Sequence, residues 1–336
     1  MSEVKIIEYS SSWEKKHAEF AKKFWPNKKR RYISEYIYWK FRGDVNMNLS
    51  SFILAVKNDL VIGQFGFIPC SVKIKGVAYS AQWICDLMVD EKYRGKGVAK
   101  KLYEYSERNG RISLGSDPSP PCQKSLIRNG YRLMRGPEKW IFPISIGGTL
   151  MLKTQYFKFF KWIKNPLLYY INYKYKNYLT NFKVCNKSDI KKKYLLSRKS
   201  CQSPYIVYDK WFLNWRMDKF KDYYPGIKMF ESIYNDSYVC FMKTSNSVLI
   251  ADYSYNSISD LATIVLLVSR YCLSKNLYFI KILSNSNKDN KMFKKLSLIK
   301  MRTSTVIVAK KNSHDLEAIT LGDKFFYTLM DSDSNI

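Results

Sequence analysis

The chain has 336 residues, of which 46% are hydrophobic and 16% aromatic, which is enough to build two globular domains. It carries 57 basic and 28 acidic residues, so a net charge of +29 favours anionic partners: nucleotides, nucleic acid, acidic carrier proteins or membrane surfaces. The seven scattered cysteines and two distant histidines argue against disulfides, metal sites and a histidine-based triad, and the lack of a signal peptide or membrane-length apolar run predicts a cytoplasmic protein.

The first 146 residues predict a domain in which helices and strands share one mixed layer. Its elements follow from helical spacing, β-rich runs, and glycine and proline at expected boundaries. We expect them in this order: helices at 13–24 and 30–41, strands at 51–57, 60–69 and 79–89, a helix from Gly97, a strand at 111–115, a helix at 120–131 and a strand at 131–144.

Residues 147–180 break this rhythm, because they are dense in aromatics and contain no acidic residue. We predict a helical connector whose aromatic side chains pack on both neighbouring domains. An alternative is a helix that contacts a membrane surface or RNA, in which case the protein would associate peripherally with the membrane.

Residues 181–336 repeat the plan of the first part, which predicts a duplicated fold. Trp215 echoes Trp39, since each precedes a basic residue at a predicted helix end. The expected elements are strands at 238–244 and 247–255, a helix at 257–273, a strand at 278–283, a helix at 287–299 and a strand at 303–311. The helix at 257–273 has no glycine at its start, and Asp260 would repel phosphate there, so we expect this second domain to be degenerate.

The turn between the strand at 79–89 and the next helix holds two glycines among basic residues, in the order Arg94-Gly95-Lys96-Gly97. The first backbone N–H groups of a helix have no partner inside it, and the helix dipole places partial positive charge there. Glycine lets the backbone approach an oxyanion closely, and arginine can donate two hydrogen bonds to phosphate. This turn therefore predicts a phosphate or pyrophosphate site.

The same residues resemble the R/Q-x-x-G-x-G/A signature of the GNAT N-acetyltransferase superfamily, and the segments LMVDEKY and SLIRNGYRL are also similar to that family. The resemblance covers about residues 50–142. It implies that backbone amides hold the pyrophosphate of acetyl-CoA, and that pantetheine lies between the strand ending at Val89 and the strand at 112–115. The cofactor-binding residues that it implies are Met88, Val89, Arg94, Gly95, Lys96, Gly97, Val98, Ala99 and Lys100.

The resemblance also implies direct transfer, with a backbone N–H near Met88 or Val89 polarising the thioester carbonyl and without a metal or a covalent enzyme intermediate. Many members have a tyrosine that protonates the leaving thiolate, and here Leu126 stands at that position. The substitutes that we consider are Tyr131, Tyr103, Cys122 and a water molecule.

An amine acceptor also needs a base, and Asp86 is the first candidate. Strict alternation along the strand would place its side chain on one face together with Ile84, Met88 and Asp90. Asp117 is the second candidate base, although its Gly-Ser-Asp-Pro context is equally typical of a turn.

We therefore expect two GNAT-like mixed α/β domains in tandem, at 1–146 and 181–336, the second degenerate, joined by the connector at 147–180. The expected activity is acyl transfer from acyl-CoA to an amine. The chain resembles tandem proteins of bacterial surface-polysaccharide synthesis, which implies an amino sugar, or a nucleotide-linked sugar, as acceptor. The alternatives are an acyl carrier protein as donor, or a non-catalytic module that binds nucleic acid or anionic membrane. A homodimer is also considered.

Overall fold

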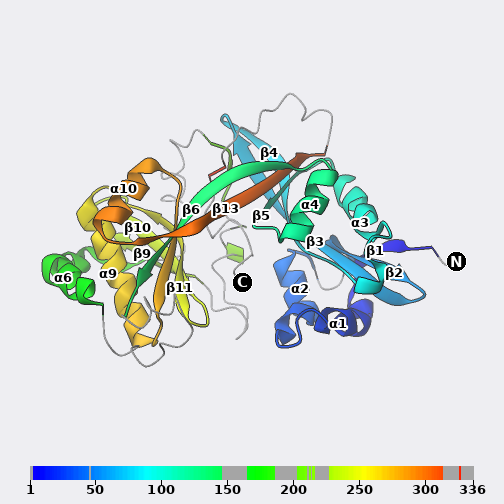
Figure 1. Cartoon of the computed structure of the whole chain (residues 1–336), viewed down its shortest axis with the longest axis horizontal. Coiled ribbons are helices and arrows are strands. Elements are labelled where there is room, and N and C mark those ends of the chain that lie inside the picture. The colour runs from blue at the N-terminus through cyan, green and yellow to red at the C-terminus, as the bar shows by residue number, and fades with distance from the viewer. Residues whose placement is uncertain are drawn as a thin grey trace.

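The computed structural model describes residues 3–44, 47–145, 165–185, 203–209, 212, 214–215, 227–312 and 325–326. One large mixed sheet runs through both halves of the chain (Figure 1). Its strands follow the order β1-β2-β3-β4-β5-β13-β6-β12-β11-β10-β9-β7, and β8 pairs with β3 beside this path. The predicted mixed α/β class is confirmed, whereas the division into tandem domains at the stated boundaries stays a prediction.

The first half closely follows the order expected from the sequence. Its elements are β1 (Lys5–Tyr9), η1 (Ser11–Trp13), α1 (Glu14–Lys22), η2 (Lys29–Tyr32), α2 (Ser34–Lys40), β2 (Leu49–Lys57), β3 (Leu60–Ile74), β4 (Val77–Val89), η3 (Glu91–Tyr93), α3 (Val98–Glu107), β5 (Ile112–Ser116), α4 (Pro120–Arg128) and β6 (Arg132–Pro143). The short edge strand β1, which pairs with β2, was not predicted, because five residues carry little periodic signal.

The second half begins with two helical segments on its outer side. Its elements are α6 (Pro166–Tyr175), η5 (Lys176–Asn181), β7 (Phe182–Val184), β8 (Tyr205–Ile206), β9 (Lys228–Ser232), β10 (Tyr238–Lys243), β11 (Ser247–Ser254), α9 (Ile258–Ser274), β12 (Phe279–Ser284), α10 (Asn287–Lys295) and β13 (Ile299–Lys311). Within the predicted connector, residues 147–164 lie outside the described residues. The part that is described packs on α9 through Leu168, Ile171 and Tyr175.

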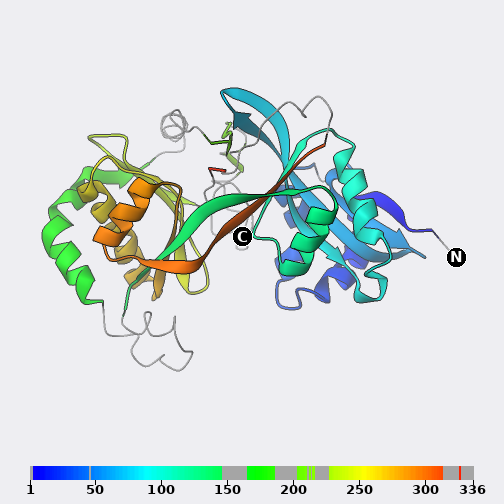
Figure 2. The ribbon, with the colours of Figure 1, turned by 45° about the horizontal axis from the view of Figure 1, so that its top comes forward.

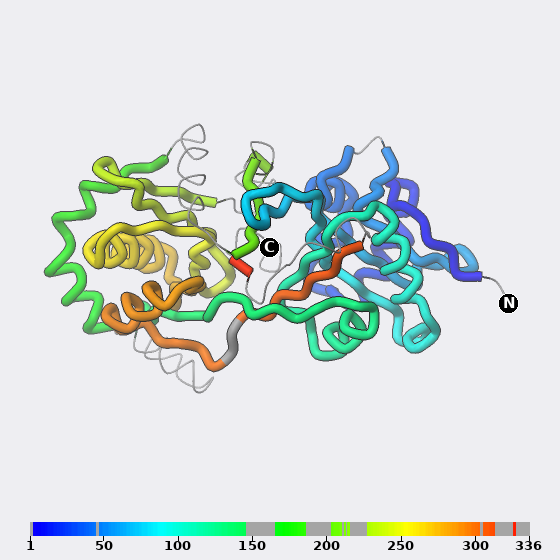
Figure 3. Tube along the Cα trace, turned by 90° about the horizontal axis from the view of Figure 1, so that it is seen from above, coloured from blue at the N-terminus to red at the C-terminus, as the bar shows by residue number. Residues whose placement is uncertain are grey.

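The two halves share two long antiparallel strands, β6 and β13, which run side by side from one half to the other (Figures 1 and 3). In the first half, β13 lies between β5 and β6, pairing Ile307 with both Ser116 and Met134. In the second half, residues 138–143 of β6 pair with β12. Strand β13, the last strand among the described residues, thus completes the sheet of the first half, and the first half supplies a strand to the second.

Helices cover both faces of the sheet in the first half, with α3 and α4 on one face and α1 and α2 on the other (Figures 1 and 2). The buried side chains divide in the same way. One apolar cluster lies under α3 and α4, and includes Leu102, Tyr103 and Leu126. Another lies under α1 and α2 and continues across the sheet into the second half. The two faces of the first half's sheet are therefore covered by different apolar clusters, one under α3 and α4 and one under α1 and α2.

Candidate functional site

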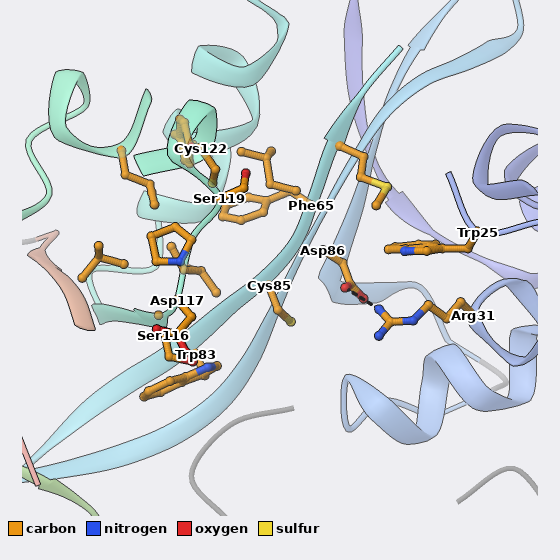
Figure 4. A pocket seen from close by; sticks show the side chains of 18 residues that line it. Trp25, Arg31, Phe65, Trp83, Cys85, Asp86, Ser116, Asp117, Ser119 and Cys122 are labelled. Atoms are coloured by element: carbon orange, nitrogen blue, oxygen red, sulfur yellow. Dashed lines mark hydrogen bonds and ion pairs between the residues drawn. The ribbon is translucent and has the colours of Figure 1, made fainter. Parts of the chain in front are cut away.

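The parallel strands β4 and β5 pair over only three residues and then separate. Their register joins Ala81–Trp83 to 112–114, and no pairing continues beyond it. A cavity of about 330 Å³ opens where they part, lined by residues of β4, the β5–α4 loop, α3 and α4, with Trp25 and Arg31 at its far side (Figure 4). This is where the sequence predicted the pantetheine cleft.

A β-bulge in β4 shapes the wall of this cavity. The register with β3 shifts between Gln64 and Gly66, and Asp86 has a φ of 52°, in the left-handed region. Gln64 stabilises the bulge, because its side-chain Nε2 donates to the backbone carbonyl of Asp86 at 3.2 Å. The oxygen of the same amide lies 2.9 Å from Nε2 of the buried His17. Neither residue was singled out from the sequence, where nothing marks a glutamine as the support of a bulge.

The bulge overturns the alternation predicted for this strand. Ile84 packs in the cluster under α3 and α4, whereas Asp86 points to the opposite face, where it meets η2 and α2. Cys85 and Met88 pack on that second face as well. Two consecutive side chains, Cys85 and Asp86, thus share the α1–α2 side, because the extra residue of the bulge resets the period of two.

Asp86 is held between two cations. Nη1 of Arg31 donates to Oδ1 at 2.9 Å, and Nζ of Lys40 donates to Oδ2 at 2.5 Å. Burial alone would raise the pKa of Asp86, but the charges and hydrogen bonds of Lys40 and Arg31 outweigh it and lower the pKa. Asp86 is therefore an ionised carboxylate at the cavity wall, and its basicity is weakened while both partners stay in place.

The strand end beyond the bulge presents one backbone N–H to the cleft. The N–H of Asp90 donates to the carbonyl of Ile62 in β3 at 2.9 Å. Since backbone groups alternate sides along a strand, Met88 also faces β3, and Val89 faces the opposite side, toward β5. The Val89 carbonyl accepts a hydrogen bond from Nε of Arg94, in the turn after β4, at 3.1 Å. Of the two predicted donors, Val89 has the suitable orientation.

The glycine-rich turn has the backbone that an anion site requires. Gly95 and Gly97 have φ values of 76° and 78°, and a Cβ at either position would meet nothing within 4 Å. Helix α3 starts at Val98, so the amides of Val98, Ala99 and Lys100 have no partner inside the helix. Arg94 folds back onto Glu91 at 3.1 Å, and its side chain is 56% exposed. The turn follows directly on the strand that lines the cavity.

The candidates for proton transfer differ in position. Leu126 and Tyr103 line the cavity together with Cys122, whereas Tyr131 packs behind Tyr103, with ring centroids 6.0 Å apart. Burial, followed by the neighbouring Cys122, raises the pKa of Tyr103. Its buried hydroxyl makes no hydrogen bond of normal geometry with the described residues. Tyr103 is thus a protonated phenol at the cavity wall.

Asp117 also lines the cavity, but both oxygens of its carboxylate accept hydrogen bonds from neighbouring strands. Oδ2 accepts from Nζ of Lys139 at 2.7 Å, and Oδ1 accepts from the backbone N–H of Val306 at 3.1 Å. The N–H of Asp117 donates in turn to the Val306 carbonyl. These bonds tie the end of β5 to β13, and the role of Asp117 as a base stays a prediction.

The corresponding region of the second half is closed. There β11 and β12 are parallel and pair over 247–249 and 279–281, as β4 and β5 do in the first half. Beyond that point the hydroxyl of Tyr253 donates to the carbonyl of Leu283 at 2.8 Å and bridges the two strands. At the start of α9, Ser257 and Asp260 cap each other, and the Asp260 carboxylate occupies the place where an anion would bind.

Comparisons with known proteins agree with this geometry. Residues 14–111 match the family model described as an acetyltransferase (GNAT) domain. A probable N-acyltransferase from Enterococcus faecalis is 12% identical, with a TM-score of 0.58 over 93% of this chain and 73% of that one. A GCN5-related N-acetyltransferase from Anabaena variabilis has the same identity, TM-score and coverage.

The N-myristoyltransferase of Saccharomyces cerevisiae, solved with bound myristoyl-CoA, is 10% identical, with a TM-score of 0.59 over 93% of this chain and 79% of that one. At these identities the solved structures establish the shared fold alone. A search of curated proteins found no match.

Proposed function

We propose that the chain, whose residues 14–111 match a GNAT acetyltransferase domain, is a GNAT-type acyltransferase that transfers an acetyl group from acetyl-CoA directly to an amine. The observation that carries the proposal is the continuity of the Arg94–Val98 turn with the cleft between β4 and β5. A ligand with a diphosphate and a narrow arm fits these two features together.

In this proposal the amides of Gly95, Gly97, Val98 and Ala99, with the start of α3, hold the diphosphate, and Lys96 and Lys100 add positive charge around it. Arg94, which now bonds Glu91, would turn onto a phosphate oxygen. The pantetheine arm lies along the open side of β4, where it reaches Met88. The amide of Val89 is a backbone donor on that side of the strand.

The transfer step forms a bond between the acceptor nitrogen and the thioester carbonyl carbon, and the carbon–sulfur bond breaks. A backbone N–H of β4 stabilises the negative charge that develops on the carbonyl oxygen. We assign Tyr103 as the proton donor to the leaving thiolate, because it lines the cavity beside Leu126 and remains protonated. Tyr131 lies one ring further from the cavity and supports Tyr103.

Asp86 stays the hypothetical base, on the condition that the acceptor displaces one of its two cationic partners. Its lowered pKa disfavours proton uptake while Arg31 and Lys40 both bind it. An incoming ammonium group that displaces one of these cations would pair with the carboxylate and then lose its proton to it. The acceptor side of the cleft therefore starts at Asp86, Trp25 and Arg31, which lie together in Figure 4.

An acyl carrier protein is a second candidate donor, favoured by the net charge of +29, since such carriers are acidic. We propose an amino sugar, free or nucleotide-linked, as the acceptor. The second half then acts as a wall of the acceptor site or as a dimerisation surface, since its own cleft is bridged by Tyr253.

The test uses thermal unfolding with acetyl-CoA. A ligand at 100 times its Kd stabilises the native state by about 2.7 kcal/mol, so the wild type should melt several degrees higher. Gly97→Glu should lose this shift, because it places a carboxylate where the diphosphate binds. Gly76→Glu is the matched control: it has the same left-handed backbone, with a φ of 87°, and open space around it, but lies in the β3–β4 turn.

The proposal fails if neither acetyl-CoA nor CoA shifts the melting temperature of the wild type. It also fails if both glutamate variants retain the same shift. Transfer is then distinguished from binding alone by measuring the release of free CoA thiol, with glucosamine or glucosamine 6-phosphate as the trial acceptor.

A further inference from the structure

A buried histidine–glutamine pair lies directly behind the bulge that shapes the cleft. His17 of α1 and Gln64 of β3 are each at most 1% exposed. The imidazole lies edge-on to the rings of Tyr9 and Phe52, which belong to the apolar cluster under α1 and α2. Polar side chains in such a core lower stability unless each is hydrogen-bonded, whereas hydrocarbon side chains would fill the same space without that penalty. Packing alone therefore does not account for the pair.

The hydrogen bonds of the pair leave the Gln64 amide only one orientation. Its Nε2 donates to the backbone carbonyl of Asp86 at 3.2 Å, and a carbonyl oxygen can only accept. The amide oxygen therefore faces His17, whose Nε2 lies 2.9 Å away and donates to it. Without a donor at His17 the amide could turn over, and its oxygen would then face the oxygen of Asp86. His17 thus selects the orientation in which Gln64 holds the bulge.

The bulge carries the residue that faces the acceptor side of the cleft. The register shift places two residues of β4 opposite a single residue of β3. Asp86, one of the two, has a φ of 52°, which non-glycine residues adopt only where their surroundings hold them. Its carboxylate binds Arg31 at 2.9 Å and Lys40 at 2.5 Å. Asp86 is thus held at its backbone by Gln64 and at its side chain by two cations.

We infer that Gln64, oriented by His17, is a positioning residue of the acyl transfer, because through the bulge it fixes the direction of the Asp86 carboxylate and of the backbone N–H of Val89. This inference rests on the proposed function. A shift of the bulge by one residue would turn the side chains and amides that follow it to the opposite side of β4. Neither His17 nor Gln64 lines the cavity, so both act through Asp86 and the strand.

The experiment measures the release of CoA thiol from acetyl-CoA, with glucosamine as acceptor and with water alone, for the full-length wild type and Gln64→Met. Methionine is close to glutamine in length but cannot donate. The variant should lower kcat about tenfold or more and change the Kd of CoA less than about threefold, because the turn at Arg94–Val98 is untouched. The low-pH limb of kcat/KM should move to higher pH, because burial raises the pKa of an Asp86 carboxylate that has lost part of its pairing.

Gln82 provides the matched control, because it is an equally buried glutamine, on β4 itself, with other partners. Its Nε2 donates to the carbonyl of Ser106 at 3.0 Å and to Oγ of Ser113 at 2.9 Å. Gln82→Met should lower the melting temperature much as Gln64→Met does, but should change kcat less than about threefold and leave the pH profile in place. Equal losses of kcat in the two variants would mean that general loosening of the sheet lowers the rate, and would overturn the inference.

Further variants test the orientation of the amide, and they decide the question if Gln64→Met lacks a cooperative melting transition. Gln64→Glu still accepts from His17 but can donate to the Asp86 carbonyl only when protonated, so its kcat relative to the wild type should rise as the pH falls. His17→Phe removes the donor and should lose kcat as Gln64→Met does, whereas His17→Gln, which retains a donor, should keep most of it. A constant ratio for Gln64→Glu at every pH, or full kcat in His17→Phe, would contradict the role of the pair.

The same measurements separate this inference from the proposed function. Wild-type kcat in Gln64→Met would overturn the positioning role and leave the proposed transferase function intact. A wild type that neither binds CoA nor releases thiol from acetyl-CoA would defeat the proposed function, and the inference with it.

Discussion

The buried pair of His17 and Gln64 makes the stability of this protein depend on pH in a predictable way. His17 is fully buried between aromatic rings, with its centroid 5.5 Å from that of Tyr9 and 5.3 Å from that of Phe52. Because Gln64 donates its amide N–H to the carbonyl of Asp86, its oxygen must accept from His17 Nε2. Nε2 therefore carries a proton.

Burial lowers the pKa of His17 from 6.5 to about 4, and the bond to Gln64 opposes this only in part. Above pH 6.5 the imidazole is neutral in both the folded and the unfolded chain, so it has no effect on the pH dependence. As the pH falls from 6.5 toward 4, the unfolded chain binds a proton that the folded chain does not bind. Stability is lost over that window, by about 2 kcal/mol at pH 5 and about 3 kcal/mol at pH 4.

The measurement is urea unfolding at pH 7, 6, 5 and 4 for the wild type and for His17→Gln, whose amide N–H can replace the Nε2–H donor but does not titrate. We expect the variant to be less stable at pH 7, owing to imperfect packing, and to lose about 3 kcal/mol less than the wild type between pH 7 and pH 4. Parallel curves for the two proteins would refute the reasoning, because they would show that His17 titrates alike when folded and unfolded.

Three further predictions concern the sheet and the cavity. A fragment of residues 1–146 should give no cooperative melting transition and no acetyl-CoA shift, because β13 is missing between β5 and β6; a normal transition would show that the first half closes its sheet without it. Tyr103→Phe should lower kcat roughly 10²-fold or more, with little change in the Kd of acetyl-CoA. Asp86→Asn should raise the KM for the acceptor and alter the low-pH limb of the kcat/KM profile. Unchanged kcat in Tyr103→Phe would remove the assigned acid, and an unchanged profile in Asp86→Asn would remove the base.

Features that depend on residues close together in the sequence could be predicted from it. The turn at Arg94–Val98 depends on two glycines, on a strand before it and on a helix after it, all within a short stretch, and its backbone has the expected conformation. Asp260 was predicted in the same way to disfavour phosphate at the start of α9, where the structure shows that it forms a capping box with Ser257. The sequence showed that Trp215 echoes Trp39, but only the fold shows that the two side chains contact each other, with 5.8 Å between their ring centroids.

Features that depend on distant residues were not accessible. Alternation along β4 failed at Asp86, because the bulge is stabilised by Gln64 from the neighbouring strand. The partners of Asp86, Arg31 and Lys40, are 55 and 46 residues away in sequence. No periodicity in the sequence indicates which cation will meet which carboxylate.

By itself, then, the sequence determined the mixed α/β class, the glycine-rich turn at Arg94–Val98 and the lack of such a turn in the second half, because each depends on local conformational preference or on the charge of adjacent residues. Only the tertiary structure decided that β13 closes the sheet of the first half, that two cations bind Asp86, and that Tyr103 lies at the cavity. These arrangements depend on long-range strand pairing and on burial, which bring together residues as far as 203 positions apart in the sequence.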